Sequence, residues 1–202
     1  TLSKATSLAA PGDTVSVKAG TYRERVNLRN KAGTPSNWIT FQGFGDGPAI
    51  LDGSDPELLG SGQNRWALYS GSVYQTSLAY TPQPYVAIDG LRAYHYPSLA
   101  SLVSGIVGIP AGWFYSNGTL YLRTKDGSDP DLHAIQVAQQ TYGFELGNSH
   151  YLAIKGFTIQ YYGGAGIRLN GSETNILIEG NTVQNNAFGI RHLPPTRRAP
   201  AE

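Results

Sequence analysis

The sequence has 202 residues, enough for one large domain or two small ones. Glycine (25 residues) and proline (12 residues) are abundant, only 14% of the residues are charged, and 13 tyrosines supply aromatic surface. A typical soluble domain is about 25% charged, and disordered chains have few aromatic residues. This composition therefore favours a turn-rich β protein and argues against a disordered chain.

The net charge and the residue types argue against several partners. Fifteen Lys and Arg residues against fourteen Asp and Glu residues give a net charge of +1 without a basic run, whereas nucleic-acid binding needs clustered cations. No apolar run approaches the roughly 20 residues of a membrane span. We expect neither nucleic acid nor a membrane as a partner. The chain has no cysteine, which excludes disulfides and thiolate metal sites and leaves the compartment open.

The first predicted elements are short strands. Valines alternate along residues 13–22 ahead of a glycine turn, and similar runs occupy residues 25–28, 38–44 and 49–53. None of these runs has helical periodicity. We expect a tight corner at Gly43-Phe44, because the same Gly-led turn recurs at Gly156-Phe157 and at Gly180-Asn181.

Residues 57–135 interrupt this pattern. Scattered strands are predicted there between stretches rich in proline and glycine, and Asp89-Gly90 predicts the turn of a hairpin. Asp126, Asp129 and Asp131 lack the remaining ligands and the closing glutamate of a calcium loop, so we interpret them as turn residues. No nucleotide-binding or metal-binding motif is present, and we predict neither a cofactor nor a metal.

Residues 141–193 contain an internal repeat. The segment Gly143–Leu146 matches Gly166–Leu169 and Gly189–His192 at steps of 23 residues, and the segments that begin at Leu152 and Phe157 recur at steps of 24. Three short strands in each period of about 23 residues are typical of a parallel β-helix, whose coils stack about 4.8 Å apart. Parallel crossovers are almost always right-handed.

The sequence therefore predicts an all-β protein, a short right-handed parallel β-helix with an inserted β-rich subdomain. We assign the first coils to residues 1–56, the inserted subdomain to 57–135, further coils to 136–193 and a tail to 194–202. The adjacent Pro194 and Pro195 cannot donate ladder hydrogen bonds, so we expect that the tail cannot continue a coil.

Several motifs now resemble a known group of proteins. The chain is similar to the N-terminal half of bacterial right-handed β-helix carbohydrate-active enzymes in the motifs PGDTVSVKAGTYRERV, WITFQGFGDGPAILDGS, PYVAIDGLRAYHYPS and FYSNGTLYLRTKDGSDP, followed by the coils from residue 141. The nearest kind is the β-xylosidase-like glycoside hydrolases of the pectate-lyase-like superfamily, in which a small β-domain interrupts the early coils. The resemblance covers roughly residues 8–193.

The resemblance implies a polysaccharide or oligosaccharide ligand and a bacterial protein that is extracellular or periplasmic. Such enzymes are usually much longer, and their paired catalytic carboxylates lie in later coils that have no counterpart here. Either the chain is a truncated relative or it uses residues that the family does not, and no catalytic residue is carried over by motif.

One column of residues is the main candidate site. Alternation after each glycine turn directs Glu145, Arg168 and Arg191 outward at equivalent positions of successive coils, about 5 Å apart, with Asn27 in the same column earlier. The two arginines are suited to clamp a uronate carboxylate, and Glu145 to act as a general acid or base. The alternative is a surface ladder in which Glu145 pairs with Arg168.

Three further residues are candidates for substrate contacts. Tyr161 and Tyr162 lie in the turn before the arginine strand and are suited to stack on sugar rings, with packing against the inserted subdomain as the alternative. His95, between two tyrosines, is placed to overhang the groove. We expect His192 to be buried or to cap the last coil.

We expect a carbohydrate-active protein of the glycoside hydrolase or polysaccharide lyase type that acts on a polysaccharide along the Glu145–Arg168–Arg191 face. Hydrolysis needs two carboxylates about 5–9.5 Å apart, and the column offers only Glu145, with Glu173 in the next turn as a conceivable partner. The alternative is a non-catalytic β-helix that binds glycan or self-associates. Because an open last coil exposes unpaired backbone groups, we also expect a homodimer through the C-terminal coils, unless residues 193–202 fold back as a cap.

Overall fold

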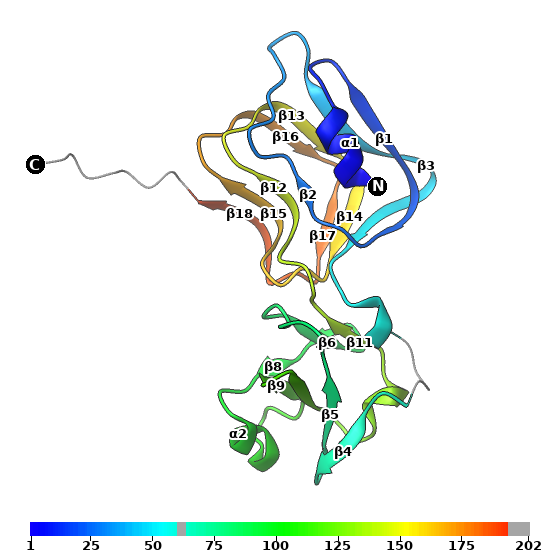
Figure 1. Cartoon of the computed structure of the whole chain (residues 1–202), viewed down its shortest axis with the longest axis vertical. Helices are drawn as coiled ribbons and strands as arrows, with labels where there is room; N and C mark the ends of the chain where they lie inside the picture. The colour runs from blue at the N-terminus through cyan, green and yellow to red at the C-terminus, as the bar shows by residue number, and fades with distance from the viewer. Residues whose placement is uncertain (60–63, 194–202) are drawn as a thin grey trace, which may run out of the picture.

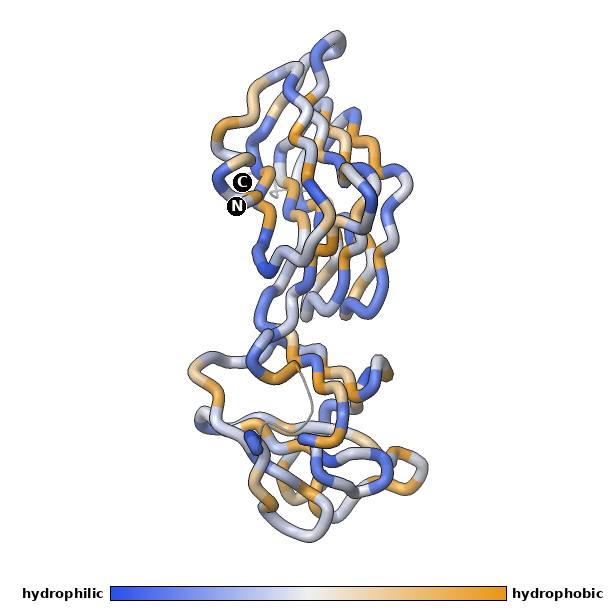
Figure 2. Tube along the Cα trace, turned by 90° about the vertical axis from the view of Figure 1, so that its right-hand side faces the viewer, coloured by the Kyte–Doolittle hydropathy of each residue, from blue (hydrophilic) through white to orange (hydrophobic). Residues whose placement is uncertain are grey.

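The computed structural model describes residues 1–59 and 64–193, which form two bodies joined by a narrow connection (Figures 1 and 2). The upper body in Figure 1 is a β-helix, and the lower body is a subdomain inserted between two of its strands. The expected class, an all-β right-handed parallel β-helix with an inserted β-rich subdomain, is confirmed. No helix within the described residues is long and apolar enough to cross a membrane.

Within the described residues, the β-helix contains ten strands and one short helix that covers its N-terminal end. These elements are α1 (Leu2–Leu8), β1 (Thr14–Tyr22), β2 (Val26–Asn27), β3 (Ile39–Asp52), β12 (Tyr142–Leu146), β13 (His150–Lys155), β14 (Phe157–Gln160), β15 (Ala165–Asn170), β16 (Thr174–Glu179), β17 (Thr182–Gln184) and β18 (Phe188–Leu193).

The coils stack in parallel register. A four-stranded sheet has the order β18-β15-β12-β2, and the other sheet has the order β16-β13-β3-β14-β17, with β1 also paired to β3. The long strand β3 bends, so that its first half pairs with β13 and its second half with β14. Phe144 pairs with Ile167 at a step of 23 residues, and Leu152 pairs with Ile176 at a step of 24, as the repeat predicts.

The predicted equivalence of Gly43-Phe44 with Gly156-Phe157 is confirmed for the glycines and wrong for the phenylalanines. A Cβ on Gly43 would lie 2.4 Å from the carbonyl oxygen of Gly156, so these two glycines do stack closely at the corner. Phe157, however, pairs with Ala49, and Phe44 is 58% exposed. Strand β3 makes an outward excursion between Phe44 and Ala49 that later coils lack, and the sequence match did not account for this insertion.

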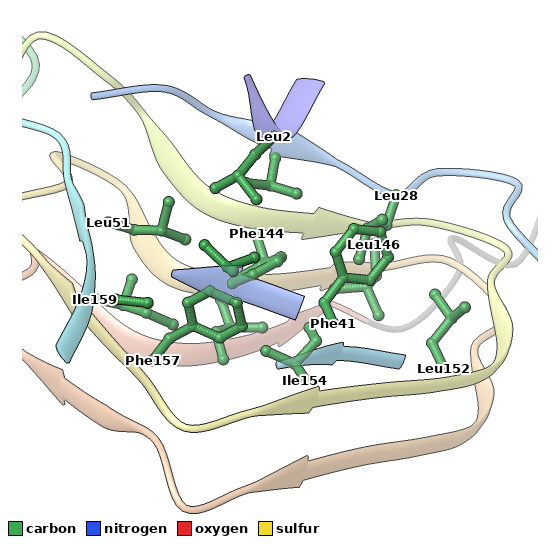
Figure 3. Close-up of a cluster of buried hydrophobic side chains, with 14 of the residues drawn as sticks. Leu2, Leu28, Phe41, Leu51, Phe144, Leu146, Leu152, Ile154, Phe157 and Ile159 are labelled. Atoms are coloured by element: carbon green, nitrogen blue, oxygen red, sulfur yellow. The ribbon is translucent and has the colours of Figure 1, made fainter. Parts of the chain in front are cut away.

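Apolar side chains from every coil fill the interior of the β-helix (Figure 3). The ring of Phe144 meets the rings of Phe41 and Phe157 edge-on, with centroids 6.4 and 5.2 Å away. Leu2 of helix α1 closes one end of this core and is 3% exposed. Burying each such side chain stabilises the fold by about 1.5–3 kcal/mol, so the stacked interior holds the coils in register.

The inserted subdomain is mostly antiparallel. Its elements are η1 (Pro56–Leu58), β4 (Ala67–Ser70), β5 (Val73–Ser77), β6 (Val86–Ile88), β7 (Leu91–Arg92), β8 (Tyr94–His95), α2 (Leu99–Ser104), β9 (Gly112–Ser116), β10 (Thr119–Arg123), η2 (Pro130–Leu132) and β11 (Ile135–Val137). One sheet has the order β4-β5-β10-β9-β8 and the other β11-β6-β7. The subdomain has its own apolar core, which includes two tryptophans.

The hairpin predicted at Asp89-Gly90 is present. Ile88 pairs with Leu91 across the turn, and both turn residues have positive φ values, of 51° and 76°. Strand β11 pairs with β6, so the subdomain extends past the expected boundary at residue 135. The predicted tail, 194–202, lies outside the described residues.

The two ends of the inserted segment are fastened together where they leave the β-helix. The carbonyl oxygen of Gly53 accepts hydrogen bonds from the backbone N–H groups of Gln139 and Gln140, at 2.8 and 3.0 Å. The N–H of Asp55 donates to the carbonyl oxygen of Val137 at 2.9 Å. Side chains add a contact with the β-helix, since the ring of Tyr85 lies 6.4 Å from that of Tyr161.

Candidate functional site

The predicted column exists on the outward face of the four-stranded sheet. Asn27 pairs with Glu145, Glu145 with Arg168, and Arg168 with Arg191, so these four residues occupy one register position on β2, β12, β15 and β18. Figure 1 shows these four strands side by side on one side of the β-helix. Parallel stacking therefore brings residues together that are separated by up to 164 positions along the chain.

Glu145 is enclosed by arginines. Its side chain is 2% exposed and forms ion pairs with Arg25, with Arg29 and with Arg168, the last two at 3.4 Å. The side chain points outward as predicted, but the long arginine side chains from neighbouring positions cover it. The expectation of an accessible general acid or base is not supported, whereas the alternative pairing with Arg168 is present.

The ring of Tyr142 contacts two of these arginines. The guanidinium carbon of Arg168 lies 4.5 Å from the centroid of the Tyr142 ring, and that of Arg25 lies 5.9 Å from it. Such cation–π contacts contribute about 0.5–1 kcal/mol at exposed sites. The Nε atom of Arg168 is buried without a hydrogen-bond partner. Tyr142 and the carboxylate together orient the arginines toward the same part of the surface.

Arg191 continues the charged face on the last described coil. It is exposed, and its guanidinium carbon lies 4.7 Å from the centroid of the Phe188 ring. Within residues 1–59 and 64–193 it forms no ion pair. The three guanidiniums of Arg25, Arg29 and Arg168 thus surround one carboxylate, and Arg191 adds a fourth on the next coil, so that this face carries a formal charge of +3. We call these four residues, together with Glu145, the arginine cluster.

Sequence reasoning missed Arg25 and Arg29. They lie two residues before and two residues after Asn27 of strand β2. This strand pairs with β12 but lies outside the repeat of residues 141–193 that revealed the column. The available signal was the expectation that Asn27 belongs to the same column. Since outward residues on either side of that position lie near the same face, the arginines two residues away were candidates.

The two tyrosines of the preceding turn differ. Tyr162 is fully buried in the β-helix core, and its hydroxyl donates to the carbonyl oxygen of Glu24 at 2.8 Å. Burial raises the pKa of this phenol. The prediction that Tyr162 stacks on a sugar is wrong, because its ring fills the interior beside Gly53, where a Cβ would lie 2.6 Å from it. Tyr161 is half-buried and packs against the inserted subdomain through Tyr85, which is the alternative given above.

Two residues near the last coil also depart from expectation. His192 is not buried: its side chain is 59% exposed, because β18 is the outermost described strand of its sheet. Glu173 is 2% exposed and accepts a hydrogen bond from the N–H of Asn170 at 2.8 Å. Its other oxygen lies 3.8 Å from Nε2 of His192. These contacts do not connect Glu173 with Glu145 as a catalytic pair.

His95 lies on the inserted subdomain rather than on the β-helix. Its ring stacks on that of Trp113, with centroids 4.0 Å apart and an interplanar angle of 13°. The acidic turn residues are structural: Asp129 caps η2, and Asp131 accepts the N–H of Trp66. No group of three His, Asp or Glu residues that could hold a metal ion is found among the described residues.

The fold and the arginine cluster define a parallel β-helix protein with a basic patch on one face. No family model matches this chain, and no curated protein matches it. Among solved structures, the chain is similar to one described as the complex structure of XylC with xylose, with a TM-score of 0.66 and 18% sequence identity. The match covers 92% of this chain and 40% of that one.

A second structure, described as a glycoside hydrolase, matches with a TM-score of 0.44 at 10% identity and covers 80% of this chain and 46% of that one. This chain thus spans less than half of either structure. At such identities, the similarity to XylC shows that the fold is shared.

Proposed function

We propose that this chain is a carbohydrate-active β-helix protein that binds an acidic polysaccharide or oligosaccharide across the arginine cluster. The observation that carries this proposal is the convergence of Arg25, Arg29 and Arg168 on the single buried carboxylate of Glu145, with Arg191 unpaired beside them among the described residues. The excess positive charge on one face favours an anionic ligand.

A uronate carboxylate fits this arrangement chemically. The guanidinium group presents donors in a rigid fork that matches a carboxylate in a bidentate fashion, and charge-assisted hydrogen bonds are the strong ones. Arg168 has its position fixed by Glu145 and Tyr142, so little side-chain entropy remains to be lost on binding. In this proposal Glu145 is a positioning residue, because its oxygens already face arginines.

The proposed type of reaction is supported by the similarity in fold. The proposal includes glycoside hydrolase or polysaccharide lyase chemistry, supported by the shared fold with XylC. It also includes an extracellular or periplasmic location, where polysaccharides are found. The arginine cluster contains one carboxylate, and hydrolysis needs two at about 5–9.5 Å. The acids of a hydrolase would therefore have to lie outside this cluster.

A second candidate function is a non-catalytic β-helix that binds glycan or self-associates. Phe188 and Ile190 on the last described coil are 52% and 53% exposed, and Leu177 is 39% exposed. Strands β16, β17 and β18 each pair with one neighbour among the described residues. Light scattering at tens of micromolar protein tests the homodimer through these coils, and a monomer would overturn it.

The first experiment compares binding of oligogalacturonate, an acidic sugar, with that of neutral xylo-oligosaccharides by calorimetry. We expect the acidic sugar to bind and Arg191→Gln to weaken its binding about tenfold. Lys18→Gln removes the same charge from an exposed position on β1 and is the matched control, expected to change binding less than twofold. Equal effects of both variants on oligogalacturonate binding would overturn the proposal.

The same sugars, offered as polymers, test for catalysis. Reducing ends would show a hydrolase, and ultraviolet absorbance of unsaturated products would show a lyase. Intact polymer together with bound oligosaccharide would favour the non-catalytic candidate.

A further inference from the structure

A hollow of about 380 Å³ lies on the inserted subdomain, away from the arginine cluster. Its lining combines aromatic rings with a cation, and the residues are Pro84, Arg92, Ala93, Tyr94, His95 and Trp113. Small-molecule sites usually measure about 300–1,000 Å³ and are lined by apolar and aromatic side chains with a few polar groups. The hollow is at the lower end of this range, which suits one ring rather than a large ligand.

The fold builds this hollow at the meeting point of two sheet edges. Strand β7 ends at Arg92 on the edge of the three-stranded sheet, and strand β8 begins at Tyr94 on the edge of the five-stranded sheet. Ala93 between them is 5% exposed. Only the buried Ala93 separates the two edge strands β7 and β8. This short connection holds Arg92 and His95 near one another.

The exposed imidazole at the hollow rests on a buried ring. His95 pairs with Trp113 across β8 and β9, so their side chains share one face of the sheet and stack. Trp113 is 3% exposed, whereas His95 is exposed, which leaves the outer face of the imidazole open. Tyr94 precedes His95 on β8 and its ring meets that of Tyr96, so it lies on the opposite face of the sheet. The imidazole of His95 is therefore the exposed ring that the core preorganises at the hollow.

The polar groups at the hollow are also available. Arg92 is exposed, its guanidinium carbon lies 5.3 Å from the centroid of the Tyr85 ring, and it forms no ion pair in the described part of the chain. Burial lowers the pKa of the His95 imidazole, so the neutral ring prevails at neutral pH. A neutral imidazole offers a flat apolar face together with one donor and one acceptor.

We infer that this hollow binds one sugar ring of a glycan, which stacks its C–H face on His95 while Arg92 donates hydrogen bonds to its hydroxyl or carboxylate oxygens. A pyranose ring has the matching chemistry, with an apolar face and polar groups around its edge. The inference concerns a second site and does not depend on the arginine cluster.

The test is a titration of the whole protein with xylo-oligosaccharides and with oligogalacturonate, followed through the imidazole signals of His95 by NMR. We expect the His95 signals to shift in a saturable manner with at least one of the two sugars. Shifts with adenosine but with neither sugar, or His95 signals that stay unmoved by either sugar, would overturn the inference.

A matched pair of variants adds a second readout. Arg92 and Lys18 are both exposed cations, but only Arg92 lines the hollow. We expect Arg92→Gln to weaken sugar binding about tenfold and Lys18→Gln to leave it within about twofold. Equal effects would overturn the inference. Arg191→Gln should leave the His95 shifts unchanged, which separates this site from the arginine cluster.

Discussion

The β-helix and the inserted subdomain hold their candidate binding residues in opposite ways. In the β-helix, parallel stacking places residues from successive coils at one register position, so that Arg168 and Arg191 accumulate charge on one face. In the subdomain, two sheet edges bring unlike residues together, and His95 rests on Trp113. The stacked arginines are held by a buried carboxylate of opposite charge, that of Glu145, whereas His95 at the sheet edge is held by the buried ring of Trp113.

The largest expected effect comes from removing the counter-charge. Glu145→Ala leaves three guanidiniums around a vacated buried position, and we expect it to lower the free energy of unfolding by about 3 kcal/mol. This value is at the lower end for a broken buried pair, because the arginines are 19–42% exposed. Urea unfolding measures it.

Glu179→Gln is the control on the same β-helix. Glu179 is 61% exposed and pairs with Lys155 at 2.9 Å, so its loss should cost at most about 1 kcal/mol. If both variants lose the same stability, Glu145 is an ordinary surface residue and its positioning role is wrong.

The next effect tests the stacking itself. Gly143 and Gly189 begin equivalent strands of the repeat, but a Cβ on Gly143 would lie 2.5 Å from the carbonyl oxygen of Gly166, whereas one on Gly189 would meet nothing within 4 Å. We expect Gly143→Ala to destabilise the protein by about 1–3 kcal/mol through overpacking. Gly189→Ala should be neutral within about 1 kcal/mol in thermal unfolding. The reverse order would contradict the register.

A smaller effect separates the two proposed binding sites. Salt screens exposed charges beyond about 10 Å at 0.1 M, so oligogalacturonate binding at the arginine cluster should fall on the order of tenfold as sodium chloride rises. Binding of a neutral xylo-oligosaccharide at the His95 hollow should change less than twofold over the same range. Calorimetry at several salt concentrations measures both, and parallel salt dependence would argue against two distinct sites.

The smallest effect concerns acid. The hydroxyl and N–H of Ser128, with help from Thr124, lower the pKa of Asp126 to about 2. Because this folded-state pKa lies below the usual value of about 3.9, the stabilisation is complete above pH of about 4 and is lost as the pH falls through 2.

Asp126→Asn should therefore be less stable than the wild type at neutral pH, and the difference should shrink on acidification. Denaturant unfolding across this pH range checks the trend. Asp46→Asn, at an exposed position of β3, is the control and should show little difference at any pH. A difference between Asp126→Asn and the wild type that stays constant with pH would contradict the assignment.

The sequence predicted the β-helix well because each coil repeats the constraint on the one before it. The pairing of Phe144 with Ile167 follows directly from the 23-residue step. The burial of Tyr162 was missed, because the alternation rule for strands says nothing about a turn whose ring folds back into the core.

The subdomain was harder to predict. Its strands pair antiparallel over short stretches with no period, so the stack of His95 on Trp113 depends on a pairing that no sequence pattern announced. The cover over Glu145 was missed for a related reason, since Arg25 and Arg29 come from a coil outside the repeat.

The backbone hydrogen bonds that join Gly53 to Gln139 and Gln140 have a consequence for the evolution of such proteins. Between β14 and β15 the chain turns the corner within residues 161–164. Between β3 and β12, the inserted subdomain occupies the equivalent corner. Because Gln139 and Gln140 return to the residue from which the segment departed, the neighbouring coils need no adjustment to its length. An inserted subdomain can therefore be lengthened, shortened or replaced at this corner while the stacking of the β-helix is retained.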